Sequence, residues 1–351
     1  MNLAAHPRVK LCTAPDERRS RDFTEGPKHY IDLDHYAEDD PFSKLPRQYE
    51  AAVEKFSADT LRKYGTVPWV VLDNKDSLVA AFRRSDTLNI IKYSAELSHY
   101  VGDSFVPLHT TLNYDGQLTN QVGIHALWES QLVEKYINDY KLVGESASFL
   151  KDPLSAIWKV LQESYGFLGE TFDRATKIEK VMMPPERFTY NHRYGKTSRR
   201  YSDAFMADYE KAVGGMVNYR LKGAPVMVSS MWLTAWQEAG KPDLGKLMSP
   251  KKATPEEKDR LASELDAWKA NTLSKNNLLL AQQKEKKVEV VEEIQAAKDM
   301  APPPPTEVIP AAATEVIPAA TPDAAPAKVK TKTKGKDGSE KTKTKPGKDG
   351  K

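Results

Sequence analysis

The sequence predicts an all-α fold, in which several amphipathic helices surround one core. Three observations lead to this expectation. Apolar residues recur at helical spacing through most of residues 29–246. Strand-like alternation is confined to short pieces such as residues 30–36. The chain has 351 residues, of which 40% are hydrophobic, enough to form a substantial core.

Five helical segments are expected in the main part of the chain. In the first, Tyr49, Val53 and Phe56 share one face at steps of three and four, and Gly65 provides a C-terminal cap with Pro68 after it. The expected helical segments are residues 45–65, 87–106, 124–140, 155–179 and 201–240. Together they favour a helical domain rather than a sheet-based one.

Composition divides the chain into four parts. We expect an irregular N-terminal remnant over residues 1–28, a helical domain over 29–246, a charged helical extension over 250–300 and a disordered Pro/Ala/Lys-rich tail over 301–351. The extension contains a strong helix start, because Thr254 can cap the helix, Pro255 suits its first position and Glu257 completes a capping box.

Charge and cysteine content exclude several classes of protein. The single cysteine, Cys12, excludes an internal disulfide framework and a cysteine-based zinc finger. The sequence contains no run of eighteen apolar residues, so it predicts no transmembrane helix. Its first twenty residues lack the apolar region of a signal peptide. The net charge is +3, and the tail alone holds ten lysines and six acidic residues. A solubilising tether explains such a tail better than specific contact with nucleic acid or an anionic surface.

One expected helix ends its apolar face in two polar side chains. Leu88, Ile91 and Ala95 lie on that face, and the next positions on it are His99 and Asp103. Burying an ionised aspartate is costly unless it is paired or binds a metal. A single such pair is more often a salt bridge or a satisfied core histidine than a metal site.

A second helix repeats this pattern. His125 and Glu129 are four residues apart on a face shared with Trp128, and His109 follows Pro107, which ends the preceding helix. Histidine combined with carboxylates is a ligand set that Zn²⁺ accepts. Two such pairs and a further histidine between residues 99 and 129 therefore favour a metal site.

These residues carry a family resemblance. The segment His99-Tyr100-Val101-Gly102-Asp103-Ser104-Phe105-Val106-Pro107-Leu108-His109 resembles the H-x-[IV]-G-D-x-x-x-P-L-H motif of the superfamily of zinc-dependent phospholipases C and fungal single-strand-specific nucleases. Ile124-His125-Ala126-Leu127-Trp128-Glu129 is similar to its L-H-x-x-W-[DE] motif, and His29-Tyr30-Ile31-Asp32 to its H-[FY]-I-D motif. The resemblance covers roughly residues 14–245 and looks most like bacterial members of the superfamily. It implies a helical fold and a zinc cluster.

The resemblance also implies a role for each matching residue. The first zinc ion would be bound by Asp16, His29, His99 and Asp103, with Asp22 as the competitor of Asp16. The second would be bound by His109, His125 and Glu129. Asp103 would also bridge toward a third ion and take part in catalysis, and Asp32 would lie near the attacking water and the substrate.

Several nearby residues are alternatives. A slipped register would place Asp34 and His35 nearer the metal than His29. His192 has no partner at ligand spacing and is expected in a loop. Arg199 and Arg200 can contact a phosphate, although a solvated loop explains them better.

The chain departs from the family pattern at its start. Family members bind a third zinc ion through the free amine of an N-terminal tryptophan and a nearby histidine, whereas the first tryptophan here is Trp69 and His6 stands in a different context. Either the chain is N-terminally incomplete or the third ion has been lost, so two zinc ions are expected and the third is not relied on. The loop over residues 110–123 is shorter than in the fungal enzymes, and Glu129 replaces their aspartate.

The resulting hypothesis is a zinc-dependent phosphoesterase of the nuclease or phospholipase C type, in which a hydroxide bridging the metals attacks a phosphodiester. Single-stranded nucleic acid, a nucleotide and a phospholipid headgroup all remain open as substrates. The family implies a periplasmic or secreted location. The alternative is a metal-binding, catalytically impaired helical scaffold, and a purely structural helical protein is a third hypothesis.

Overall fold

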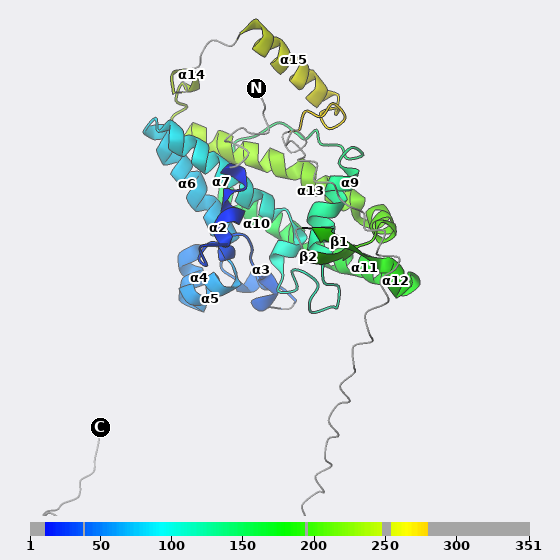
Figure 1. Cartoon of the computed structure of the whole chain (residues 1–351). Helices are drawn as coiled ribbons and strands as arrows, with labels where there is room; N and C mark the ends of the chain where they lie inside the picture. Colours follow the sequence, from blue (N-terminus) through cyan, green and yellow to red (C-terminus); the bar gives the residue numbers. More distant parts are fainter. Residues whose placement is uncertain (1–10, 38, 194–195, 248–253, 280–351) are drawn as a thin grey trace, which may run out of the picture. The chain divides into compact units, whose positions relative to one another are not determined.

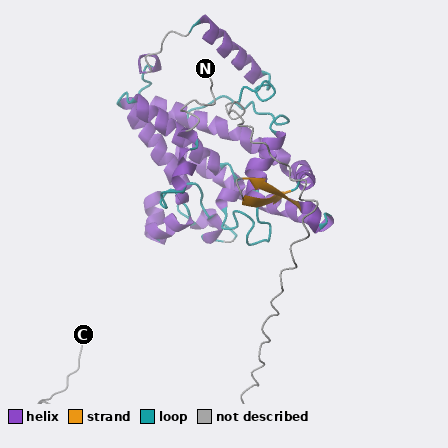
Figure 2. Cartoon of the chain, viewed as in Figure 1, coloured by secondary structure: helices purple, strands orange, loops and turns teal. Residues whose placement is uncertain are grey.

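The computed structural model describes residues 11–37, 39–193, 196–247 and 254–279. These residues all belong to the first of the two units into which the chain divides, Met1–Glu292 and Glu293–Lys351. The tail expected over residues 301–351 and most of the extension's second half lie outside the described residues, as does His6. The described part is mostly helical, as predicted from the sequence (Figure 2).

Short helices form the first third of the fold. They are α2 (Ala14–Arg19), η2 (Gly26–Lys28), η3 (Leu33–His35), α3 (Pro41–Lys44), α4 (Tyr49–Phe56) and α5 (Ala58–Tyr64). The single helix expected over residues 45–65 is broken at Ser57, which has a φ of 72° and caps α5 by accepting a hydrogen bond from the Thr60 amide. Gly65 ends α5 with a φ of 96°, in agreement with its expected capping role. The segment expected to be irregular contains α2.

The rest of the described chain contains the longest helices together with several short ones. They are α6 (Val67–Arg83), α7 (Thr87–Ser104), η4 (Pro107–Thr110), α8 (Ile124–Ala126), the π-helical turn η5 (Leu127–Gln131), α9 (Leu132–Tyr136), α10 (Pro153–Gly166), α11 (Leu168–Val181), α12 (Pro184–Arg187), α13 (Asp203–Glu238), α14 (Leu244–Leu247) and α15 (Pro255–Lys269). Their starts follow capping rules: Asp86 accepts from the Asn89 amide at the start of α7, and Thr254 and Glu257 form the predicted capping box of α15.

One antiparallel hairpin interrupts the helices. Strands β1 (Phe188–Arg193) and β2 (Lys196–Tyr201) pair with Phe188 opposite Tyr201, and they are the strands found in the described part of the chain (Figure 2). His192 therefore lies in a strand and not in the expected loop. By contrast, the alternation of residues 30–36 does not form a strand, because Leu33–His35 form the 3-10 turn η3.

The helix α13 joins two apolar clusters. It is 36 residues long, about 54 Å at 1.5 Å per residue, and it packs against α6, α7 and α11 (Figure 1). Its C-terminal half contributes Met231 to the first cluster, which contains α6, α7 and α10. Its N-terminal half contributes Phe205 to the second cluster, which contains η5, α11 and the hairpin. None of the described helices is both long and apolar enough to cross a membrane.

Candidate metal centre

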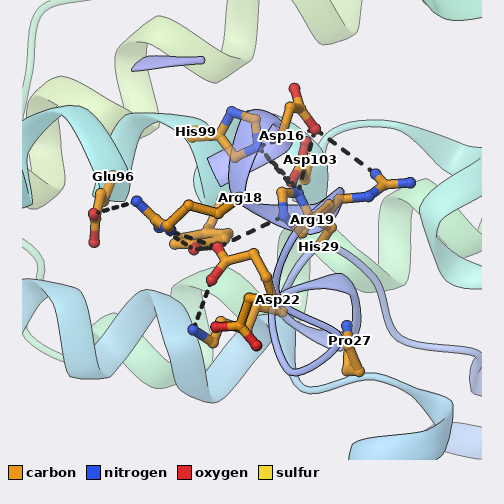
Figure 3. A network of polar contacts seen from close by, with 12 residues as sticks. Asp16, Arg18, Arg19, Asp22, Pro27, His29, Glu96, His99 and Asp103 are labelled. Atoms are coloured by element: carbon orange, nitrogen blue, oxygen red, sulfur yellow. Dashed lines mark hydrogen bonds and ion pairs between the residues drawn. The ribbon is translucent and has the colours of Figure 1, made fainter. Parts of the chain in front are cut away.

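A first group of ligand atoms gathers around the C-terminal part of α7. His99 and Asp103 stand one turn apart on this helix, His29 directly follows η2, and the three side chains converge. The Nδ1 atom of His29 lies 2.9 Å from Asp103 Oδ2 and 3.0 Å from His99 Nε2. Asp16, from α2, places Oδ1 at 3.8 Å from both histidine nitrogens (Figure 3). Asp16, His29 and His99 can together hold a metal ion.

A second group lies beyond the end of α7. His109 belongs to η4, His125 to α8 and Glu129 to the π-helical turn η5. The Nε2 atoms of the two histidines are 3.1 Å apart, and Glu129 Oε2 lies 2.8 Å from His125 Nε2 and 3.6 Å from His109 Nε2. These three residues form the second group that can hold a metal ion. π-Helical turns are rare and often occur at functional sites.

Asp103 stands between the two groups. Its Oδ2 atom faces His29 and lies 3.5 Å from His99 Nε2, while its Oδ1 atom lies 3.9 Å from His109 Nδ1. The carboxylate is buried. One side chain thus lies between the two groups, whereas its expected role as a bridge toward a third ion stays a prediction.

Hydrogen bonds to the backbone connect the two groups and orient the ring of His109. The Nδ1 atom of His109 lies 2.7 Å from the carbonyl oxygen of His29, and the amide of Ile31 donates back to the carbonyl of His109 at 2.9 Å. A carbonyl only accepts hydrogen bonds, so the Nδ1 atom carries the proton and donates. The Nε2 lone pair of a neutral His109 is consequently free and directed at His125 and Glu129, which suits a metal ligand.

Electrostatics within the second group keep the carboxylate ionised. Burial alone would raise the pKa of Glu129, but hydrogen bonding and charge from His109 and His125 outweigh it and hold the pKa well below its usual range. Burial lowers the pKa of His109, whereas Asp103 and Glu129 raise it to about 9. The group is an electronegative pocket that stabilises a positive charge, whether a proton or a metal ion.

The spacing of the ligand atoms fits a small cation. Ligand atoms around a tetrahedral Zn²⁺ with bonds of 2.0–2.1 Å lie roughly 3.3 Å apart. The ligand atoms lie 2.9–3.8 Å apart in the first group, with Asp103 included, and 2.8–3.6 Å apart in the second. In each group the two imidazoles bring a pair of ring nitrogens within 3.0 and 3.1 Å of each other. Nitrogen-rich donor sets of this kind suit Zn²⁺ better than Mg²⁺ or Ca²⁺.

Both groups open into one cleft of about 710 Å³. Arg19 of α2 lines it, half-exposed, with its guanidinium 3.7 Å from Asp16 (Figure 3). The exposed ring of Tyr114 lines the cleft beside His125. At its inner side Arg220, 1% exposed, donates to the carbonyl of Phe105 at 2.9 Å and so fixes the chain just after α7.

The alternative ligands take other roles. The carboxylate of Asp22 caps a turn by accepting from Thr24, so Asp16 is the aspartate that joins the first group. Asp34 accepts from Leu112 at 3.0 Å and stabilises the loop after the second group's first histidine. His35 is exposed and stacks on the ring of Tyr64 at 3.3 Å. None of these three side chains belongs to the two ligand groups found among the described residues.

Asp32 and the hairpin residues are not members of the two ligand groups found among the described residues. Asp32 is buried, and it is not among the residues that line the cleft. Its role near substrate stays a prediction. Burial and the neighbouring charge of Asp34 raise the pKa of Asp32 to about 7. Arg199 is exposed and stacks over Phe188 at 4.2 Å, and His192 bonds Thr197 across the hairpin.

Sequence reasoning missed three charged residues that support the first group. Arg18 and Arg19 follow Asp16 on α2, and Glu25 lies 3.8 Å from the Nε2 atom of His29. A helix-like spacing of four residues between Glu25 and His29 was visible in the sequence. It was not used because residues 1–28 were expected to be irregular.

Comparison with known proteins leaves the family of this chain open. No protein-family model, no curated protein and no solved structure matches it. The arguments for its function therefore rest on the chain's own residues.

Proposed function

We propose that the protein is a zinc-dependent hydrolase of phosphoester bonds. The observation that carries this proposal is the position of Asp103, whose two carboxylate oxygens face two separate ligand groups in one cleft. Paired metal sites that share a carboxylate are typical of enzymes that displace a leaving group from phosphorus. The motif resemblance points to the same chemistry.

The metal chemistry requires two ligand sets. Asp16, His29, His99 and Asp103 would hold one Zn²⁺, and His109, His125 and Glu129 would hold the other. When bound, such ions lower the pKa of a water molecule and neutralise charge on phosphoryl oxygens.

Side chains that line the cleft would bind and orient the substrate. Arg19 presents a half-exposed guanidinium in the same cleft, and guanidinium groups match the geometry of phosphate oxygens. It would bind and orient the anionic group beside the ligand cluster. Tyr114 contributes an exposed ring on the same side as His125, a surface that any planar or apolar part of the substrate can contact.

The first test is the zinc content per chain of protein purified without chelators. We expect about two zinc ions in the parent protein and a sharp loss in Asp103→Ala, since this carboxylate is a ligand of the first group and lies beside His109 of the second. Asp16→Ala should weaken the first group, whereas the matched control Asp22→Ala should not, because among the described residues the Asp22 carboxylate accepts its hydrogen bonds from Thr24 of its own turn. No zinc in the folded parent would refute the proposal.

The second test is hydrolysis. Bis(p-nitrophenyl) phosphate, a short single-stranded oligonucleotide and phosphatidylcholine micelles separate a general phosphodiesterase, a nuclease and a phospholipase C. Loss of Asp103 should reduce turnover at least about a hundredfold. Bound zinc with no turnover of any of the three would instead indicate a catalytically impaired metal-binding scaffold.

A further inference from the structure

A buried carboxylate lies directly behind the first ligand group. Glu25 is 1% exposed, although charged side chains are rarely buried unless they are paired. It belongs to neither ligand group. The residue that it faces is His29, whose Nε2 atom lies 3.8 Å from Glu25 Oε1.

Three donors hold this carboxylate in place. Arg18 donates to Oε1 at 3.1 Å and Lys28 to Oε2 at 2.8 Å, and the hydroxyl of Tyr100 also donates to Oε1. Donors on both carboxylate oxygens fix the side chain, so it cannot rotate away from His29.

The two nitrogens of His29 have different surroundings. The Nδ1 atom faces Asp103 and His99 in the ligand group. The Nε2 atom is buried, and no described residue forms a hydrogen bond with it. If Nδ1 offers its lone pair to a metal ion, the proton of the neutral ring must reside on Nε2. That proton lies on the side of the Glu25 carboxylate.

We propose that Glu25 is a positioning residue for the first metal site, which holds the proton of His29 on Nε2 and the imidazole in the orientation that presents Nδ1 to the metal. The second ring nitrogen of a histidine ligand commonly faces a carboxylate, a backbone carbonyl or a water molecule, and the loss of that partner weakens metal binding. The inference rests on the proposed function, because it assumes that the first group binds a metal ion.

A structural role for the same cluster makes a different prediction. Arg18 also bonds Glu96 of α7 at 2.9 Å, so the cluster connects α2 with α7 (Figure 3). If Glu25 served only this connection, its loss would lower the free energy of unfolding and leave the metal affinity of the folded protein unchanged. Buried ion pairs contribute little net stability in many proteins, which favours a role beyond the connection.

The experiment isolates the first site. The His125→Ala background removes a ligand of the second group. In this background, the Kd for Zn²⁺ is measured by chelator competition for the protein that retains Glu25 and for the protein that also carries Glu25→Gln. We expect the Gln variant to bind about 10- to 100-fold more weakly. The matched control is Glu96→Gln, which loosens the same Arg18 cluster without facing His29, and its affinity should stay within about twofold. Circular dichroism confirms that each variant is folded.

A spectrum and a second variant complete the test. The visible absorption of bound Co²⁺, which reports ligand geometry, should shift in Glu25→Gln and not in Glu96→Gln. If Glu25→Gln does not fold, Tyr100→Phe takes its place, because it removes one donor to the carboxylate and keeps the ring. The loss of one hydrogen bond should then weaken binding roughly 2- to 12-fold.

The outcomes separate the two proposals. Unchanged Zn²⁺ affinity in folded Glu25→Gln, or in Tyr100→Phe where that variant is used, overturns the role of Glu25 and leaves the proposed function intact. If the parent binds metal but the His125→Ala background does not, the first group is not an independent site. This result also overturns the proposed role of Glu25. A parent protein that binds no Zn²⁺ overturns the proposed function, and this inference with it.

Discussion

The buried carboxylate of Asp32 makes the protein's stability dependent on pH. Asp32 is 8% exposed, and in the described part of the chain no side chain or backbone group donates a hydrogen bond to its carboxylate. Burial, and then the charge of Asp34, raise its pKa from 3.8 to about 7 in the folded protein. One pKa unit corresponds to about 1.4 kcal/mol, so an ionised Asp32 lowers the free energy of unfolding by about 4 kcal/mol.

The sign follows from the raised pKa. Below pH 3.8 the carboxyl group is protonated in the folded and unfolded states, and its contribution is fully retained. As the pH rises through about 7, the folded protein must ionise a buried group and this stability is lost. Asp32→Asn keeps the size of the side chain but cannot ionise. We therefore expect it to be more stable than the parent at about pH 8, by up to about 4 kcal/mol, and by only about 1 kcal/mol at about pH 4.5.

The assay is urea unfolding of metal-free protein at both pH values, followed by circular dichroism. Asp59→Asn is the control, because the side chain of Asp59 is 90% exposed and a surface change should alter stability by at most about 0.5 kcal/mol at either pH. An advantage of Asp32→Asn that is the same at both pH values, or absent at the higher one, would refute the assignment of a raised pKa to Asp32.

Three further predictions concern stability. Gly65→Ala should destabilise the fold by more than about 2 kcal/mol in urea unfolding, since Gly65 has a φ of 96° and a Cβ there would lie 2.1 Å from the carbonyl oxygen of Tyr30; Gly26→Ala, with open space around it, should be near neutral. Leu97→Ala should cost about 2–5 kcal/mol in the same assay because Leu97 is fully buried, and a cost below about 1 kcal/mol would contradict this packing. The lowered pKa of Glu25 contributes stability above pH 4.5 that is lost as the pH falls toward 2; Glu25→Gln should therefore lose less stability than the parent between about pH 6 and pH 3, and equal losses would contradict the shift.

The sequence predicted most of the long helices but missed α6 and the interruptions of the others. Hydrophobic spacing located α7 and α13 well, because a long periodic segment leaves little ambiguity. The break at Ser57 depends on a local positive φ that spacing does not encode. Pro68 was interpreted as a stop after the preceding helix, whereas it occupies the first turn of α6, where proline is well tolerated. The same residue signals the end of one helix and the start of the next.

The candidate ligands were predicted unequally for a physical reason. His99 with Asp103, and His125 with Glu129, are local pairs on helices, so their geometry follows from a spacing of four residues. Asp16 and His29 join them only through long-range packing of α2 and η2 against α7, and they were found through the motif resemblance alone. The supporting Glu25 and Arg18 belong to that same long-range packing, which a pattern within one helix cannot show.

The cleft lies where the chain passes from the first apolar cluster to the second. Phe105 belongs to the first apolar cluster and Val106 to the second, so the chain passes from one to the other immediately after Asp103. Polar side chains at such a junction can be removed from bulk water without occupying the interior of either cluster. The first group lies at the end of α7, and the second begins with η4 just beyond the crossing. Arg220 of α13, bonded to the carbonyl of Phe105, fixes the crossing point from the helix that joins both clusters. The position of Asp103 between the two groups is thus a consequence of where α7 ends.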